Sequence, residues 1–217
     1  MKKIGVVLSG CGVYDGSEIH EAVLTLLAID RHGCEAICMA PAADFSVTNH
    51  LNSQETGEKR NILVESARIA RGNIRDISEV TAADIDAIML PGGFGAAKNL
   101  CDFALKGAAA DVNPDVARLL KEMVAASKPI GAVCIAPVLL AAVLGKEYSA
   151  KVTIGNDAGT AAEIKKTGAR HEECPVTGLV VDIPNKLVTS PAYMLASRIS
   201  EVADGIDICV KEVVRLL

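Results

Sequence analysis

The sequence places Cys134 directly after a short apolar run, residues 129–133, and shortly before Pro137. Proline is favoured in the first turn of a helix, so this pattern predicts a strand that turns sharply into a helix at the cysteine. A thiol on such an elbow faces the backbone N–H groups of the helix, which favour the thiolate and therefore a nucleophile. A cysteine among apolar neighbours is equally often a small buried hydrophobe, and the spacing alone leaves both interpretations open.

A glycine pair and two acidic residues add to the chemistry expected around Cys134. Gly92 and Gly93 follow a buried apolar run, and glycines allow a turn whose N–H groups point inward as an oxyanion hole. Glu18 and Glu21 share one face of a predicted helix, and a carboxyl group near a thiol could transfer protons. The alternatives are an ordinary glycine turn and acids that only complement the helix dipole. The dipole explanation is preferred for Glu18, and the role of Glu21 stays open at this point.

Segments of strand and helix character alternate along the chain, so the predicted fold is α/β, a flavodoxin-like three-layer sandwich with a mostly parallel sheet and helices on both faces. We expect a single domain over residues 1–217, because that length suits one large α/β domain. Apolar runs predict strands over 3–8, 35–40, 85–90 and 129–133, and a hairpin over 179–182 and 186–189. Helical spacing predicts helices over 18–30, 61–70, 96–105, 114–126, 136–144 and 195–216, the last broken near Gly205.

Other segments are identified by local signals. Residues 42–60 are polar without clear periodicity, so we expect an excursion from the core, and residues 160–163 form a capping box that predicts a further helix start. Ligands of parallel sheets bind at the carboxyl ends of the strands, near a topological switch point. Three loops should meet there, namely residues 9–16, 91–95 and 134–137.

Composition excludes several classes of function. The net charge is −5 and no basic run occurs, which argues against a nucleic-acid partner. No apolar stretch approaches the length of a membrane span, so we expect no membrane partner. Gly10, Gly12 and Gly16 miss the dinucleotide fingerprint by one residue, and no ribose-binding acid follows the second strand, so no cofactor is expected.

Seven cysteines occur without any CxxC spacing. Cys34 and Cys38 lie four residues apart near a strand edge, which is a poor metal pair, so no metal site is expected. Unpaired cysteines are typical of reducing compartments, and the simple inference is a cytoplasmic protein.

Several of these motifs together resemble a known superfamily. Residues 90–96, 132–137 and 186–191 resemble the superfamily of Parkinsonism-associated deglycases, PfpI-type proteases and class I glutamine amidotransferases. Within it, residues 8–22 and 191–195 are similar to the bacterial enhancing-lycopene-biosynthesis proteins, which are ElbB-type glyoxalases. The resemblance covers nearly the whole chain.

The resemblance implies roles for particular residues. Cys134 falls on the nucleophile, Glu21 on the glutamate that contacts it, and Gly93 and Ile135 on the oxyanion donors. It implies a glutathione-independent glyoxalase that converts glyoxal or methylglyoxal to glycolate or lactate through a Cys hemithioacetal, without metal or cofactor, and a homodimer. Apparent deglycase activity would follow from the same chemistry.

The chain departs from its relatives in its histidines. Ile135 stands where the PfpI-type proteases carry histidine, and the late His-x-Glu of the amidotransferases is missing. His20, His50 and His171 remain candidates for a catalytic histidine, although structural roles are preferred for all three.

The alternative function is a non-catalytic redox sensor or a regulatory protein linked to isoprenoid biosynthesis. The Cys134 thiol would then be oxidised rather than turn over substrate. Cys11 could serve as its resolving thiol, because its loop should lie near the same edge of the sheet.

Overall fold

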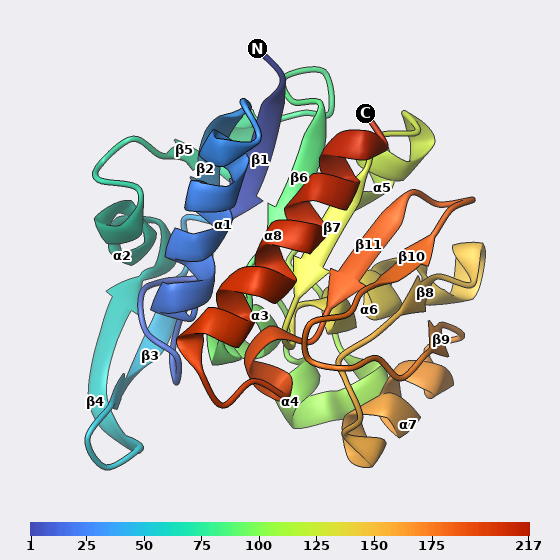
Figure 1. Ribbon diagram of the computed structural model, residues 1–217. Helices are drawn as coiled ribbons and strands as arrows, with labels where there is room; N and C mark the ends of the chain where they lie inside the picture. Colours follow the sequence, from blue (N-terminus) through green and yellow to red (C-terminus); the bar gives the residue numbers. More distant parts are fainter.

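A seven-stranded sheet forms the centre of the protein in a computed structural model that describes all 217 residues (Figure 1). The strand order is β10-β11-β7-β6-β1-β2-β5, and every neighbouring pair is parallel except β10 and β11. The predicted α/β fold with a mostly parallel sheet is therefore confirmed. The strands are β1 (Lys3–Val7), β2 (Glu35–Ala40), β5 (Arg75–Asp76), β6 (Ala87–Leu90), β7 (Ile130–Val133), β10 (Val180–Asp182) and β11 (Leu187–Ser190).

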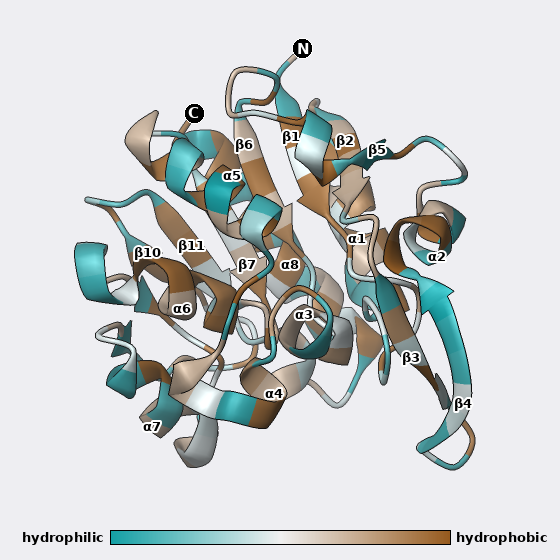
Figure 2. Cartoon of the chain, turned by 180° about the vertical axis from the view of Figure 1, so that it is seen from behind, coloured by the Kyte–Doolittle hydropathy of each residue, from teal (hydrophilic) through white to brown (hydrophobic).

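Helices cover both faces of this sheet. Helices α1 and α8 lie side by side across one face (Figure 1), and α5 and α6 cover the other (Figure 2). The central strands β6, β7 and β11 are buried along their whole length, which explains why they read as unbroken apolar runs. The main helices are α1 (Ile19–Arg31), α2 (Ile62–Ile69), α5 (Pro114–Ala125), α6 (Pro137–Tyr148), α7 (Ala158–Lys166) and α8 (Ile199–Arg215).

The strand order reverses at β1, which gives the sheet a topological switch point between β1 and β6. The chain runs from β1 to β2 on one side, and β6 then pairs with β1 on its other side. The loops that follow β1 and β6 therefore diverge at the carboxyl edge of the sheet, which is where open α/β sheets bind ligands.

The predicted helix over residues 96–105 is interrupted, and two short helices, α3 (Phe94–Lys98) and α4 (Phe103–Lys106), replace it. Cys101 pairs with Val112 in a β-bridge, and the N–H of Asp111 donates to the Asp102 carboxylate at 2.7 Å. These long-range bonds hold residues 99–102 out of the helical conformation. The 3-10 helix η2 (Gly107–Ala109) follows directly.

The helix start predicted from residues 160–163 is wrong by three positions. The Asp157 carboxylate accepts the N–H of Thr160 at 2.7 Å, so Asp157 is the N-cap and Thr160 lies inside α7. Helix α8 likewise starts at Ile199 rather than residue 195, after the 3-10 helix η3 (Ala192–Met194), and runs unbroken through Gly205. A side chain at Gly205 would come within 3.1–3.2 Å of Val176 O and Ser190 Oγ, so this glycine allows close packing rather than a break.

The polar segment forms a hairpin outside the main sheet, as an excursion from the core. Its strands are β3 (Asp44–Asn49) and β4 (Gln54–Asn61), and the hairpin projects from the body of the molecule (Figure 1). A second small sheet pairs β8 (Lys151–Val152) with β9 (Arg170–His171), and η1 (Ile77–Glu79) follows β5. None of the helices has the length and apolar character needed to cross a membrane.

Candidate active site

Cys134 occupies a sharp elbow between β7 and α6. Its φ is 61°, in the left-handed region that non-glycine residues rarely adopt. The Cys134 N–H donates to Ser190 O at 3.0 Å, which extends the pairing of β7 with β11 by one residue and fixes the backbone at the turn. The side chain is therefore directed out of the sheet at the carboxyl edge.

The three loops expected at this edge do meet. The N–H of Phe94 donates to Val13 O at 2.8 Å, and the N–H of Gly95 donates to Gly16 O at 2.9 Å. The N–H of Glu18 in turn donates to Gly92 O at 2.9 Å. These backbone bonds join the loop after β1 to the loop after β6 and hold both beside Cys134.

Glu21 lies in the first turn of α1 and is completely buried behind this junction. Its carboxyl oxygens accept the N–H of Gly92 at 3.0 Å and the N–H of Tyr193 at 3.1 Å, and the side chain also hydrogen-bonds to Cys134. Burial raises the pKa of Glu21 from 4.5 to about 7, although these hydrogen bonds act in the opposite direction. The carboxyl group can therefore gain and lose a proton near neutral pH.

The backbone of Gly92 lies in close contact with the side chains of both Cys134 and Glu21. A Cβ atom at this position would lie 2.6 Å from Glu21 Oε2 and 2.8 Å from Cys134 Sγ, and it would overlap Cys134 Cβ. Only glycine lets the backbone pass so close to the thiol and the carboxyl group.

The electrostatics of Cys134 differ from the expectation of a thiolate at a helix terminus. Burial and the Glu21 carboxylate raise the pKa of Cys134 well above its ordinary value, while the N–H groups of Gly93 and Ile135 lower it. These N–H donors alone would favour a thiolate, but burial and the Glu21 carboxylate act against it. When Glu21 is charged, Cys134 therefore holds its proton, and the two side chains act as one acid–base pair.

A cavity of about 390 Å³ opens above this pair. Cys134, Gly93 and Ile135 all line it, whereas Glu21 lies behind the sulfur, outside the lining. The structure thus brings all four predicted site residues together at one end of the sheet. The cavity is lined by Val13, Glu18, Gly93, Phe94, Cys134, Ile135, Asp157, Thr160, Tyr193 and Met194.

Glu18 is the N-cap of α1. Its carboxylate accepts the N–H of Glu21 at 2.7 Å, which is a capping bond of the kind that first-turn acids make. This agrees with the structural role preferred for Glu18, and the capping bond also fixes the backbone of the residue that contacts the thiol.

The histidines make structural contacts outside the cavity lining. His50 accepts the N–H of Tyr14 at 3.2 Å, and His171 accepts the N–H of Ile154 at 3.3 Å. His20 lies 2.8 Å from the hydroxyl of Tyr193, so it reaches the cavity only through that side chain.

Sequence reasoning missed the roles of Gly92 and Tyr193 as backbone donors to Glu21. Both residues lie in segments that the sequence had marked out. Gly92 belongs to the glycine pair, and Tyr193 belongs to residues 191–195, which resemble the ElbB-type proteins. A backbone N–H leaves no mark on residue type, however, so neither role could be assigned without the fold.

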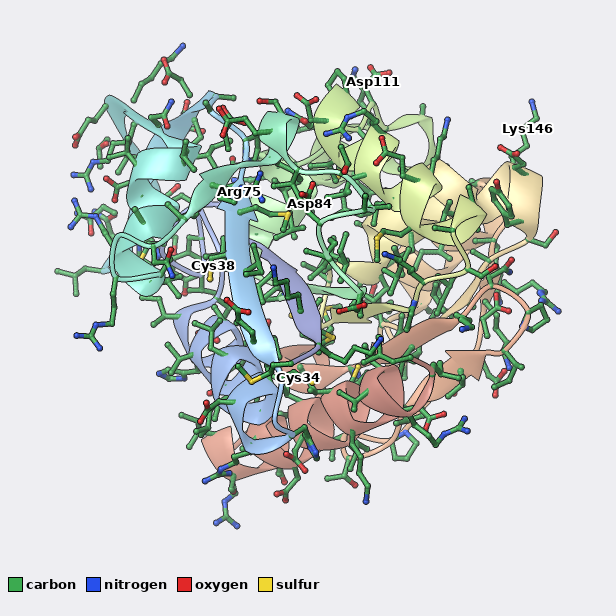
Figure 3. All side chains as sticks on the ribbon, turned by 90° about the horizontal axis from the view of Figure 1, so that it is seen from above. Cys34, Cys38, Arg75, Asp84, Asp111 and Lys146 are labelled. Carbon is green, nitrogen blue, oxygen red and sulfur yellow. The ribbon has the colours of Figure 1, made fainter.

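No group of three or more potential metal-ligating side chains converges anywhere in the structure. Cys34 lies just before β2 and Cys38 lies within it (Figure 3), and all seven cysteines are free thiols. Cys11 is half-buried and does not line the cavity that holds Cys134.

Comparison with known proteins gives consistent matches. The profile of the DJ-1/PfpI family matches residues 13–196. The human glutamine amidotransferase-like class 1 domain-containing protein 3, mitochondrial, is 47% identical over 225 aligned positions, covering 99% of this chain and 83% of its own length. The rat ES1 protein homolog, mitochondrial, is 45% identical over 99% of this chain and 84% of its own length.

A crystal structure from Ehrlichia chaffeensis, described as an isoprenoid biosynthesis protein with an amidotransferase-like domain, has the same fold. It superposes with a TM-score of 0.93 and 39% identity, covering 100% of this chain and 99% of that one.

The names of the curated relatives contradict the expectation of a cytoplasmic protein. The human and rat proteins are named mitochondrial, as is the zebrafish ES1 protein, which is 34% identical over 98% of this chain. The expectation depended on unpaired cysteines, and free thiols indicate a reducing environment without distinguishing one reducing compartment from another.

Proposed function

This chain belongs to the DJ-1/PfpI family, and from that premise we propose that it is a glutathione-independent glyoxalase. It converts glyoxal or methylglyoxal to glycolate or lactate by chemistry that uses only its own side chains, backbone and water. The observation that carries the proposal is the pair formed by the Cys134 thiol and the buried Glu21 carboxyl group, whose pKa is about 7. An acid–base group poised near neutrality beside a nucleophile is what a proton-moving reaction of an aldehyde requires.

The first step joins the sulfur of Cys134 to the aldehyde carbon. As the S–C bond forms, the thiol proton passes to the Glu21 carboxylate and the carbonyl electrons move to the oxygen. The N–H groups of Gly93 and Ile135, which face the sulfur, donate to this oxyanion. Glu21 then returns the proton to the oxygen, and the product is a neutral hemithioacetal.

The second step moves a proton between neighbouring carbons. The Glu21 carboxylate removes the hydrogen of the former aldehyde carbon as a proton, and the electrons form an enediolate with the adjacent carbonyl group. Glu21 gives the proton to the neighbouring carbon, the hydroxyl proton shifts to the neighbouring oxygen, and a thioester of the 2-hydroxy acid results. Positioned acid–base catalysis of this kind contributes about 10²–10⁴-fold in rate.

Water completes the cycle. Hydrolysis breaks the thioester C–S bond, releases glycolate or lactate and returns the thiol of Cys134. The overall reaction adds one water to the dicarbonyl, so no oxidant or reductant is consumed.

The test is formation of lactate from methylglyoxal by the purified protein without glutathione. We expect turnover by the wild-type protein and none by Cys134→Ala. Wild-type protein that forms no lactate, or an active Cys134→Ala protein, would refute the proposal.

A second candidate function, redox sensing by Cys134, has one observation in its favour. An oxygen atom added to the Cys134 sulfur would accept hydrogen bonds from the N–H groups of Gly93 and Ile135, which face the sulfur. However, burial and Glu21 raise the pKa of Cys134, and redox-sensing cysteines have low pKa values. Absence of dicarbonyl turnover, together with addition of oxygen to Cys134 by dilute peroxide, would favour redox sensing.

A further inference from the structure

A second chamber adjoins the cavity above Cys134. It has a volume of about 610 Å³, and four residues line both spaces: Phe94, Ile135, Asp157 and Thr160. The two spaces therefore lie next to each other and share a boundary. Sites that hold a drug-sized ligand have volumes of about 300–1,000 Å³, so the chamber is far larger than glyoxal or methylglyoxal needs.

The chamber has an apolar wall and a polar rim. Phe94, Ala97, Phe103 and Ala104 from α3 and α4 line one side, and Ile135 stands at the junction with the Cys134 cavity. The polar part of the lining consists of Asp157, Thr160 and Glu163 from the α7 segment and Lys106 at the end of α4. Phe94 is 48% exposed and Ala104 is also exposed, so an apolar group bound there would remove these two side chains from water, which favours binding.

The chamber exists because the expected helix over residues 96–105 is interrupted. Lys106 forms ion pairs with Asp102 at 2.6 Å and with Asp111 at 2.7 Å. These ion pairs hold together the two ends of the segment that contains α4. The N–H of Ala108 donates to the Glu163 carboxylate at 2.9 Å and joins this segment to α7. Helices α4 and α7 lie together beyond the ends of the parallel strands (Figure 1), so the chamber has walls held by tertiary bonds.

We infer that the preferred substrate is a 2-oxoaldehyde with a bulky apolar substituent, whose aldehyde lies at Cys134 and whose substituent occupies the chamber between α4 and α7. The inference rests on the proposed glyoxalase function. The substituent contributes binding energy at a distance from the reacting carbon, and such energy can be used to orient the aldehyde for attack. Phenylglyoxal is a suitable probe, because its ring matches the apolar wall.

Two substitutions fill the chamber from opposite walls without touching the Cys134 pair. Ala104 is exposed on α4, and Gly159 is exposed on α7, where an added Cβ would meet only Asp157 Oδ1 at 3.6 Å. We expect Ala104→Trp and Gly159→Phe to lower kcat/KM for phenylglyoxal by about tenfold or more, while kcat/KM for methylglyoxal changes little. Leu105→Trp is the matched control, since Leu105 is 79% exposed and does not line the chamber.

Alkylation of Cys134 measures the chamber independently of turnover. We expect iodoacetanilide to alkylate Cys134 with saturable kinetics and faster than iodoacetamide, relative to their rates with a free thiol, and Ala104→Trp to abolish this preference. Mass spectrometry assigns the modified cysteine.

The outcomes separate the two proposals. Methylglyoxal turnover without any preference for phenylglyoxal or iodoacetanilide would overturn the chamber inference and leave the glyoxalase proposal intact. Absence of all turnover together with an Ala104-dependent preference for iodoacetanilide would overturn the glyoxalase proposal but keep the chamber as the site of an apolar group. Identical behaviour of wild-type, Ala104→Trp and Gly159→Phe proteins in both assays would overturn the inference.

Discussion

The side chains of Cys134 and Glu21 share a site in which only one of them can readily carry a negative charge. Burial disfavours both anions, and the Glu21 carboxylate raises the pKa of Cys134 further. The N–H groups of Gly92 and Tyr193 donate to the Glu21 carboxyl group, and two other backbone N–H groups face the Cys134 sulfur. Each of the two side chains therefore has two backbone donors of its own. The protonation of one residue therefore controls the reactivity of the other.

The raised pKa of Glu21 makes folding stability depend on pH. A carboxyl group whose pKa rises from 4.5 to about 7 on folding binds more protons in the folded state than in the unfolded state. The free energy of unfolding should therefore fall as pH increases from about 4.5 to above 7, by about 3 kcal/mol from this group. Urea denaturation of the wild-type and Glu21→Gln proteins across this range measures the effect. The difference between the two pH curves isolates Glu21, and parallel curves would contradict the raised pKa.

At the scale of elements, the elbow was predictable because strand, cysteine and proline follow one another along the chain. The alternation of strands and helices and the meeting of the three loops also followed from local patterns. Local patterns did not identify the second reactive group, which only the family resemblance assigned to Glu21. The spacing of Glu18 and Glu21 places both on one face, and the packing of α1 against Gly92 shows that Glu21 is buried and Glu18 is the cap.

The elements that sequence reasoning missed or placed wrongly have different causes. The bridge between Cys101 and Val112 interrupts a segment whose local pattern favours one helix. The hairpin of β3 and β4 was not predicted because β4 is polar and exposed along almost its whole length, so no apolar alternation marks it as a strand. Asp157 begins α7 outside the capping-box pattern, so the box misplaced the helix start.

The loop after β6 should tolerate no side chain at Gly92. We expect Gly92→Ala to lower turnover by about a hundredfold or more, because its methyl group displaces Cys134 and Glu21, and overpacking should cost about 1–3 kcal/mol of stability. Gly159→Ala is the matched control, because its methyl group meets only one atom, at 3.6 Å, and both variants are assayed with methylglyoxal, which does not occupy the chamber that Gly159 lines. Steady-state rates and thermal denaturation measure both effects. Normal turnover in a folded Gly92→Ala protein would show that the close approach of Gly92 has no part in positioning Cys134 and Glu21.

At the scale of the whole molecule, α1 presents apolar residues on two faces. The inner face packs against α8 and the sheet, while Ile19, Val23 and Leu27 form an outer stripe in which the three residues are 43%, 48% and 39% exposed. These residues follow each other at intervals of four, so they lie in one row along the helix. Exposed apolar rows of this kind are typical of interfaces, and we propose that a second copy of the chain covers the row.

Light scattering tests the homodimer. We expect the wild-type protein to have twice the mass of one chain, and Val23→Glu to shift it toward the monomer by placing a charge in the stripe. Val64→Glu is the control, since Val64 on α2 is 63% exposed but lies outside the stripe. A monomeric wild-type protein, or a Val23→Glu protein that remains dimeric, would count against this interface.

The most direct test of the acid–base pair compares Glu21→Gln with Glu18→Gln. Methylglyoxal turnover and the rate of alkylation of Cys134 by iodoacetamide are measured on both variants and on the wild-type protein. We expect Glu21→Gln to lose at least about a hundredfold in turnover, because an acid–base catalyst is removed. Its Cys134 should be alkylated at least as fast as in the wild-type protein, because removing the carboxylate lowers the pKa of the thiol. Glu18→Gln should keep most of its turnover. Near-normal turnover by Glu21→Gln would contradict the account, because the proton would then move through another group.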